Sequence, residues 1–454
     1  MSHPTQPSTP PSTPALPPTS GEPALRAVTS LHPADEIDLV RLLPHGPATE
    51  LVAWVRGGEG MVGWGRALEL SATGPGRWAE LADRWREVTD ASTDEGSAGA
   101  PRGAGLVAWV SAAFSDDSPA GSTLVVPRTV VGVHEGVAWV TRIEQLSPGV
   151  VSEDVPSTGT TGATGADALP REGTPPVAPR GLREAPGLTP DEGWEEVVAA
   201  GIDAVRGGRA EKVVLARDVL ATAAEPLDLR WLLQRFAAGY PDTWTFAVDG
   251  LVGATPEMLV RLDGGRVFSR VLAGTIPREA GAGQDQRVAD GLLHSTKDLA
   301  EHAFAVESVV ERLAPLCTTV EAPGTPSVLP LPNVFHLSSD VDGRVRPGTT
   351  VLELAGALHP SAAVGGTPRE AALELITELE GRDRDRYAAP VGWVDAAGDG
   401  DMGLALRCGR VLEEDPATLR LWAGGGIMAD SDPRTEWVET GAKLAPMRWA
   451  LGTD

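Results

Sequence analysis

The sequence predicts a mixed α/β (α+β) fold with large sheets, and not a simple doubly wound fold. Three observations lead to this prediction. Short apolar runs alternate with turn residues in the first half, apolar residues recur at helical spacing after residue 189, and helices and strands follow one another irregularly in the second half. The 454 residues allow two or three average domains, or one large one.

The first half is expected to form an antiparallel sheet with one helix on a face, from about residue 25 to 150. Residues 1–24 are rich in Pro, Ser and Thr, and residues 151–188 are of low complexity, so we expect a disordered tail and a mobile loop. The helix is expected at about 78–88, and strands at the apolar runs 51–55, 105–110, 123–126 and 137–141.

The region 189–454 is expected to carry the functional site. It opens with Thr189-Pro190-Asp191-Glu192, a capping box with proline at the first helical position, which predicts an amphipathic helix. Further helices are expected at 285–313, 368–380 and 433–451. Further strands are expected at 212–215, 243–248, 267–273, 391–394, 404–408 and 418–423.

Composition excludes several classes of function. The net charge of −25 and the pI of about 4.7 argue against a binder of nucleic acid or anionic membranes. No apolar run approaches the roughly 20 residues of a membrane span, and the N-terminus lacks the basic and apolar parts of a signal peptide. The cysteines, Cys317 and Cys408, show no metal or disulfide spacing, so a cytoplasmic protein is expected. An anionic substrate would therefore require local cations or a metal.

The chain has only three lysines, Lys212, Lys297 and Lys443, among 38 basic residues. Arginine stays charged, whereas a buried lysine can lose its proton and act as a base. Lys212 begins a predicted apolar strand, and Glu257 lies in a Gly/Pro turn. A lysine base and a glutamic acid suit proton transfer on two sides of a substrate. The alternative is a purely structural role, in which Lys212 is a charge at a strand edge and Glu257 is a solvated turn residue.

Two predicted helices carry acidic side chains on one face. Two such helices are a typical way to hold a hard cation such as Mg²⁺, although each helix alone is equally typical of an exposed, salt-bridged face. The sets are Glu436, Glu439 and Lys443 on the last helix, and Asp298, Glu301 and His302 beside Lys297 on the central one.

Residues 398–403 match the dinucleotide-binding pattern G-x-G-x-x-G. The match follows a predicted strand but leads into another strand, whereas the dinucleotide motif requires a helix at this point. A β-hairpin is therefore expected here.

Eight segments, in order, resemble motifs of the chorismate-utilising enzymes, and they cover about 190 to 450 densely. The resemblance implies one large fold of two packed, mainly antiparallel sheets with helices outside, a magnesium-dependent site and, as in many related enzymes, a monomer. The segments are KVVLAR, GATPE, AGTIPR, KDLAEH, LHPSAAVGG, YAAPVGW, ALRCG and AGGGIMADSDPRTEWVETGAKL.

Single positions within these motifs favour the isochorismate synthases of the family. Lys212 matches a lysine of isochorismate and salicylate synthases that anthranilate synthases lack. Ala273 stands where aminodeoxychorismate synthases carry a nucleophilic lysine, and His359 and Ala363 differ from the Phe and Thr of salicylate synthases. A salicylate synthase is the nearest alternative, and a catalytically inactive chorismate-binding protein is another. Menaquinone synthesis is the expected pathway, with siderophore synthesis second.

The resemblance also implies roles for individual residues. Lys212 would deprotonate the water that attacks ring C2 of chorismate, and protonated Glu257 would donate to the departing C4 hydroxyl. Glu301 and Glu439 would hold Mg²⁺, with Asp298 and Glu436 nearby. Substrate contacts are implied for Gly274, Thr275, His336, Tyr387, Arg407, Gly424 and Lys443.

Two motifs depart from the family pattern. The usual AGAG reads AGGG at 423–426. The usual RG-x-YAGP reads RDRYAAP here, so Asp385 and Ala389 replace glycines. Both changes bear on the backbone beside Tyr387.

Overall fold

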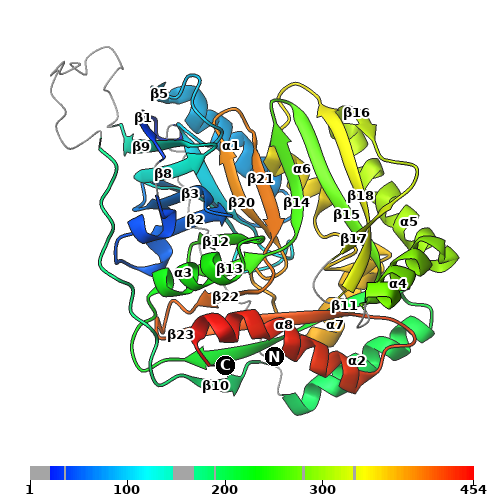
Figure 1. Cartoon of the computed structure of the whole chain (residues 1–454). Coiled ribbons are helices and arrows are strands. Elements are labelled where there is room, and N and C mark those ends of the chain that lie inside the picture. The colour runs from blue at the N-terminus through cyan, green and yellow to red at the C-terminus, as the bar shows by residue number, and fades with distance from the viewer. Residues whose placement is uncertain are drawn as a thin grey trace, which may run out of the picture.

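The computed structural model describes residues 21–34, 37–146, 168–188, 191–278, 282–330 and 334–453. In this part of the chain 23 strands form one sheet of 13 strands, sheet A, and one of 10 strands, sheet B (Figure 1). The predicted two-sheet fold is thus confirmed. The predicted disorder of residues 1–20, the predicted loop over 151–167 and the predicted cap at 189–190 lie outside the described residues.

The strand pairs in both sheets are antiparallel, apart from the parallel pair β1–β5. Sheet A runs in the order β10 (Arg183–Pro186), β11 (Lys212–Thr222), β23 (Thr418–Ile427), β22 (Cys408–Val411), β13 (Leu251–Thr255), β12 (Trp244–Val248), β2 (Leu51–Arg56), β3 (Glu59–Trp64), β8 (Thr129–His134), β9 (Val137–Gln145), β1 (Leu25–Pro33) and β5 (Thr93–Glu95), with β19 (Gly366–Thr367) beside β11. Sheet B runs in the order β16 (Cys317–Glu321), β18 (Val334–Val345), β15 (Arg266–Pro277), β14 (Met258–Asp263), β21 (Gly400–Leu404), β20 (Pro390–Asp395), β6 (Val107–Ser111), β7 (Ser122–Val126) and β4 (Leu68–Ala72), with β17 (Ser327–Pro330) beside β18.

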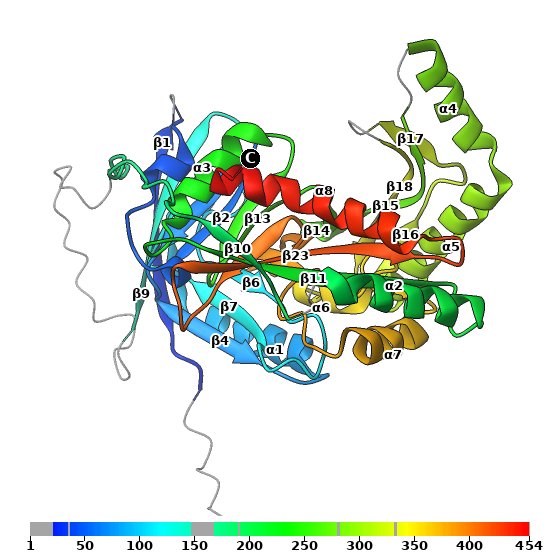
Figure 2. The same cartoon turned by 90° about the horizontal axis from the view of Figure 1, so that it is seen from below.

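Helices cover both sheets. Helices α2, α3 and α8 pack on strands of sheet A, α1, α5 and α6 on strands of sheet B, and α7 on β11 and β19. Figure 2 shows α8 and α2 running along β23 and β11. The helices are α1 (Arg77–Ala91), α2 (Asp191–Arg206), α3 (Leu229–Gly239), α4 (Ala282–His294), α5 (Thr296–Leu313), α6 (Val351–Leu358), α7 (Arg369–Glu380) and α8 (Pro433–Leu451), with short 3-10 turns at 39–42, 48–50 and 314–316.

The largest hydrophobic core joins the two sheets. It contains Trp54 and Trp139 of sheet A together with Trp109 and Trp393 of sheet B, each at most 3% exposed. A second core lies between sheet A and helices α3 and α8. Because burial of a large apolar side chain contributes roughly 1.5–3 kcal/mol, these contacts hold the layers together.

The chain crosses between the sheets twice at the same place. Residues 256–257 separate β13 in sheet A from β14 in sheet B, and residues 405–407 separate β21 in sheet B from β22 in sheet A. Since β13 pairs with β22 and β14 pairs with β21, the two crossings lie side by side. They share the hydrogen bonds Ala254 N–H to Arg407 O (3.2 Å) and Leu404 N–H to Glu257 O (3.0 Å).

Four local predictions were wrong. The strands expected in the first half do not form one sheet, since β2 and β9 lie in sheet A and β6 and β7 in sheet B. The helix expected at 285–313 is two helices, because the side chain of Ser295 caps a new helix by accepting from the N–H of Asp298. The strand expected at 404–408 is the second crossing, where Arg407 has a left-handed φ of 50°. Residues 183–186 of the expected loop form β10, which pairs with β11. The hairpin expected at 398–403 is confirmed, since β20 and β21 pair around it.

No helix in the described ranges is both long enough and apolar enough to cross a membrane. Cys317 and Cys408 are both buried and free.

His359, at the end of α6, is a buried titratable group. It is 2% exposed, its Nε2–H donates to the carbonyl of Phe114 (2.9 Å), and its ring packs edge-to-face on the Phe114 ring. Burial lowers the pKa of this imidazole from 6.5 to about 3, outweighing the hydrogen bond to Phe114, which raises it. The folded protein therefore keeps His359 neutral.

We expect His359 to make the fold less stable in acid. The unfolded imidazole binds a proton below a pKa of about 6.5, whereas the folded one does not until about pH 3. This residue should therefore remove about 1.4 kcal/mol from the free energy of unfolding between pH 7.5 and 5.5. In urea titrations, the free energy of unfolding of His359→Gln should fall between pH 7.5 and 5.5 by that amount less than the free energy of unfolding of wild type. The variant His45→Gln, at an exposed histidine, is the control. An equal loss in wild type and His359→Gln would contradict the assignment.

Candidate active site

Three consecutive glycines of β23, Gly424, Gly425 and Gly426, make room for functional side chains. A Cβ added at Gly426 would lie 2.7 Å from Lys212 Cε, and one at Gly424 would lie 3.3 Å from the Tyr387 hydroxyl. A Cβ at Gly425 would lie 2.7 Å from Glu436 Oε2. Since successive strand residues face opposite sides, Lys212 and Tyr387 lie over one face of β23 and Glu436 over the other.

Gly425 and Gly426 were not among the predicted site residues. The available signal was an uninterrupted glycine run inside a predicted strand, because a glycine there often marks the close approach of another group.

Glu257 lies at the first crossing, and Arg407 at the second. Burial raises the pKa of the Glu257 carboxyl, and the nearby charges of Arg407 and Lys212 offset this only partly. The charge of Lys212 thus acts on a buried carboxyl whose pKa is raised, as the pairing of a base with an acid requires. The sequence predicted both residues but could not place them together.

Tyr387 is held between the crossing and β23. Its side chain is buried, and its ring stacks on Trp422 of β23 at 6.0 Å between centroids. Burial raises the pKa of the phenol above its usual value, so the hydroxyl stays protonated and can donate a hydrogen bond. Among the predicted substrate contacts, the structure thus brings Tyr387, Arg407 and Gly424 together.

A buried ion pair that the sequence did not reveal supports the strand of Lys212. Arg384 and Glu380 are at most 2% exposed and pair with each other, and Arg384 Nη2 donates to the carbonyl of Val214 (2.6 Å). Glu380 accepts from the N–H of Ala216 (2.8 Å). The i,i+4 spacing of Glu380 and Arg384 was the sequence signal that could have indicated this ion pair. Both bonds fix β11 close to Lys212.

Helix α8 packs along β23, and Glu436 is its acidic residue closest to the glycine segment. Asp432 caps the helix, and Lys443 donates to the carbonyl of Gly424 (2.8 Å) while it pairs with Glu439 (2.5 Å). Glu436 is 8% exposed; its Oε1 accepts from Ser431 Oγ (2.9 Å), and its Oε2 is buried without a hydrogen-bond partner among the described residues. Burial raises the pKa of this carboxyl.

The remaining predicted residues form a second group on α5, β15 and β18. Gly274 is a bulge of β15 with φ of 75°, and a Cβ there would lie 3.2 Å from the Cβ of Asp298. His336 pairs in register with Thr275, whose side chain lies outside the described part, as does that of Lys297. Bulges are frequent beside active sites, where they re-aim neighbouring groups.

His302 does not belong with a metal site. It is buried, with Nδ1 3.1 Å from the carbonyl of Ala273 and Nε2 2.8 Å from Ser339 Oγ, so it fixes α5 to β15 and β18. Its neighbour Glu301 is exposed.

The structure does not gather the four predicted metal-binding carboxylates. Glu436 and Glu439 lie on α8, and Asp298 and Glu301 lie on α5. Within the described ranges, no three His, Cys, Asp or Glu side chains are arranged to hold a metal ion.

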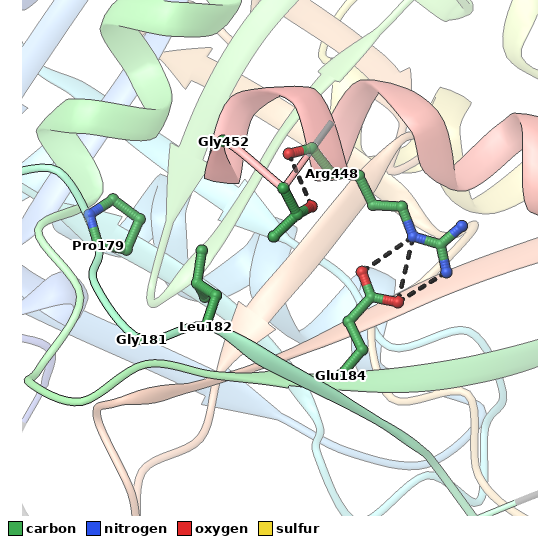
Figure 3. A pocket seen from close by; sticks show the side chains of 7 residues that line it. Pro179, Gly181, Leu182, Glu184, Arg448 and Gly452 are labelled. Carbon is green, nitrogen blue, oxygen red and sulfur yellow. Dashed lines mark hydrogen bonds and ion pairs between the residues drawn. The ribbon is translucent and has the colours of Figure 1, made fainter.

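Two cavities lie away from these residues. One of about 610 Å³ lies beside the ion pair of Glu184 and Arg448, which joins β10 to the end of α8 (Figure 3). The other, of about 520 Å³, is lined by Arg66, Arg386 and Arg410 among others. Neither is lined by a predicted site residue, so the assignment of the site depends on the clustering around β23.

Comparison with known proteins identifies relatives. The family described as "Chorismate binding enzyme" matches residues 20–452. Isochorismate synthase DhbC of Bacillus subtilis is 40% identical over 275 residues, which are 58% of this chain and 68% of that protein. The salicylate biosynthesis isochorismate synthase of Pseudomonas aeruginosa is 35% identical over 407 residues, 86% of this chain and 82% of that protein. The structure of MenF, the menaquinone-specific isochorismate synthase of Escherichia coli, has the same fold, with a TM-score of 0.72, 22% identity and coverage of 95% of each chain.

We expect Glu257→Gln to stabilise the fold at neutral pH. The unfolded carboxyl ionises with a pKa of about 4.3, whereas burial raises the pKa of the folded carboxyl. The wild-type fold therefore loses stability as the pH rises above about 4.3 towards the pKa of the folded carboxyl. In urea titrations the variant should be more stable than wild type at pH 7.5, and the difference should shrink at pH 5. The exposed Glu225→Gln controls for loss of one negative charge. A difference that does not change with pH would disprove the raised pKa.

Proposed function

This chain is an enzyme of the chorismate-binding family, and we propose that it is an isochorismate synthase, which moves the ring hydroxyl of chorismate from C4 to C2. The carrying observation is that the charge of Lys212, which lies against the glycine segment of β23, acts on the buried carboxyl of Glu257. The names of the two relatives that share 35–40% identity support the same activity.

In the proposed reaction Lys212 Nζ takes a proton from water as the water oxygen bonds to ring C2. The ring double bonds shift, the C4–O bond breaks, and Glu257 donates its proton so that the C4 hydroxyl leaves as water. One water enters and one leaves, so the product is an isomer. The raised pKa of Glu257 supports its role as the acid, because the carboxyl must hold a proton at neutral pH.

Chorismate carries two carboxylates, whereas the protein has a net charge of −25. Binding therefore depends on local donors. In the proposed site Arg407 and the Tyr387 hydroxyl bind the pyruvyl carboxylate together with the backbone at Gly424, since a guanidinium fork suits a planar anion. Lys443 adds a compact positive charge beside Gly424.

We propose Mg²⁺ as the cofactor. The residues of α8 fit a cation, because Glu436 Oε2 is a buried acceptor without a hydrogen-bond partner in the described structure and Glu439 lies one helical turn away. Glu436 and Glu439 would hold the ion. Bound Mg²⁺ would supply positive charge for a substrate carboxylate.

The decisive experiment is product identification after purified protein is incubated with chorismate, with and without Mg²⁺. Isochorismate is expected as the product, and only with Mg²⁺. Salicylate and pyruvate as primary products would establish a salicylate synthase instead. Tight chorismate binding without turnover at any Mg²⁺ concentration would identify an inactive binding protein.

Lys212→Arg is expected to fold normally and to lose at least about a hundredfold in kcat, since arginine keeps the charge but cannot serve as the base. Steady-state kinetics with chorismate measure the loss. Lys297→Arg, the same substitution at a lysine without an assigned role, is the matched control and should turn over at near the wild-type rate. Near-normal turnover by Lys212→Arg would remove this residue from the mechanism.

A further inference from the structure

Left-handed backbone is concentrated around Tyr387 and Arg407. In the described part of the chain five residues other than glycine have a positive φ, and four of them lie in one region: Asp249, Asp385, Ala388 and Arg407. Each costs roughly 1–2 kcal/mol relative to ordinary backbone. Such residues persist only where the surrounding structure fixes them, and they cluster at functional sites.

An ion-pair network holds this region together. Asp249, in the turn between β12 and β13, accepts from Arg66 Nη2 (2.6 Å) and from Arg386 Nη1 (2.8 Å). The buried Arg386 also donates to Thr123 Oγ1 (2.8 Å). Because Arg386 immediately precedes Tyr387, these bonds fix one end of the segment that carries the tyrosine.

Asp385 fixes the same segment to β22. Its two carboxylate oxygens lie 2.8 and 2.9 Å from Arg410 Nη1, and its carbonyl accepts from the N–H of Phe114 (2.9 Å). Arg410 lies on β22, three residues after Arg407. The Asp385–Arg410 pair therefore connects the segment of Tyr387 directly to the strand that follows Arg407.

This pair is partly shielded from water, since the side chains of Asp385 and Arg410 are 19% and 13% exposed. A shielded, charge-assisted contact of this kind is stronger than an exposed surface pair. An aspartate also suits this left-handed position, because Asp tolerates such backbone better than most residues.

We propose that Asp385 is a positioning residue, which through its ion pair with Arg410 holds Tyr387 and Arg407 at the spacing needed to bind one carboxylate of the substrate. The inference rests on the proposed function, which makes these two residues carboxylate ligands. It adds a residue that touches neither the substrate nor the reacting atoms.

The test separates charge from backbone conformation. Asp385→Asn keeps the size and the tolerance of left-handed backbone but removes the charge, and Arg410→Gln removes the other partner. Each should raise KM for chorismate about tenfold with kcat within about twofold of wild type, as loss of binding shared by ground state and transition state predicts. The double variant should show no larger effect than Arg410→Gln alone, because both single variants remove the Asp385–Arg410 pair, while Arg410 also pairs with Glu413 (3.1 Å) and Asp249 (3.9 Å).

A control distinguishes positioning from general stability. Glu184→Gln breaks the Glu184–Arg448 pair, which is 28% and 29% exposed and lies outside the site (Figure 3). It should lower the melting temperature without changing KM. An unchanged KM in folded Asp385→Asn and Arg410→Gln, or additive effects in the double variant, would overturn the proposal.

Failure of the proposed function would be seen separately. If wild type makes no isochorismate, calorimetric Kd values for chorismate replace KM. Weaker binding by both single variants, with no further weakening in the double variant, supports the positioning role even then. Unchanged Kd values overturn it.

Discussion

The paired crossing of β13–β14 and β21–β22 between the two sheets is the constraint on which the site depends. Backbone groups buried at such a bend must be hydrogen-bonded. Here each crossing supplies partners for the other, through Leu404 N–H to Glu257 O and Ala254 N–H to Arg407 O. Glu257 and Arg407 are therefore carried on the ends of rigid strands, which places functional groups more accurately than a free loop does.

Burial and local charge act together at this crossing. An acidic protein would repel a dicarboxylate, and the proposed site offers three cations against this: Lys212 of β11, Arg407 of the second crossing and Lys443 of α8. Withdrawal from water gives Glu257 its raised pKa, and the neighbouring cations only reduce the effect. The glycine segment of β23 makes this crowding possible, since a Cβ at Gly425 or Gly426 would lie 2.7 Å from Glu436 or Lys212, and one at Gly424 would lie 2.7 Å from the carbonyl of Leu215 and 3.3 Å from the Tyr387 hydroxyl.

The acidic residues differ in what supports them. Those of α8 lie against sheet A, while those of α5 lie against sheet B, where His302 fixes the helix to β15 and β18. The distance between the two acidic faces is therefore set by the relative position of the two sheets and not by either helix. Each helix alone shows an ordinary acidic face.

The sequence by itself determined the elements whose signals are local. Helices α1, α7 and α8 were predicted to within a few residues, and residue chemistry selected Lys212 and Glu257. Tertiary structure alone decided that residues 404–408 cross between sheets, and that Glu257 lies beside Lys212. It also decided that Asp385 meets Arg410. The physical reason is that caps and helical periodicity depend on neighbours in the chain, whereas these contacts depend on which strands pair, and partners far apart in sequence leave no local pattern.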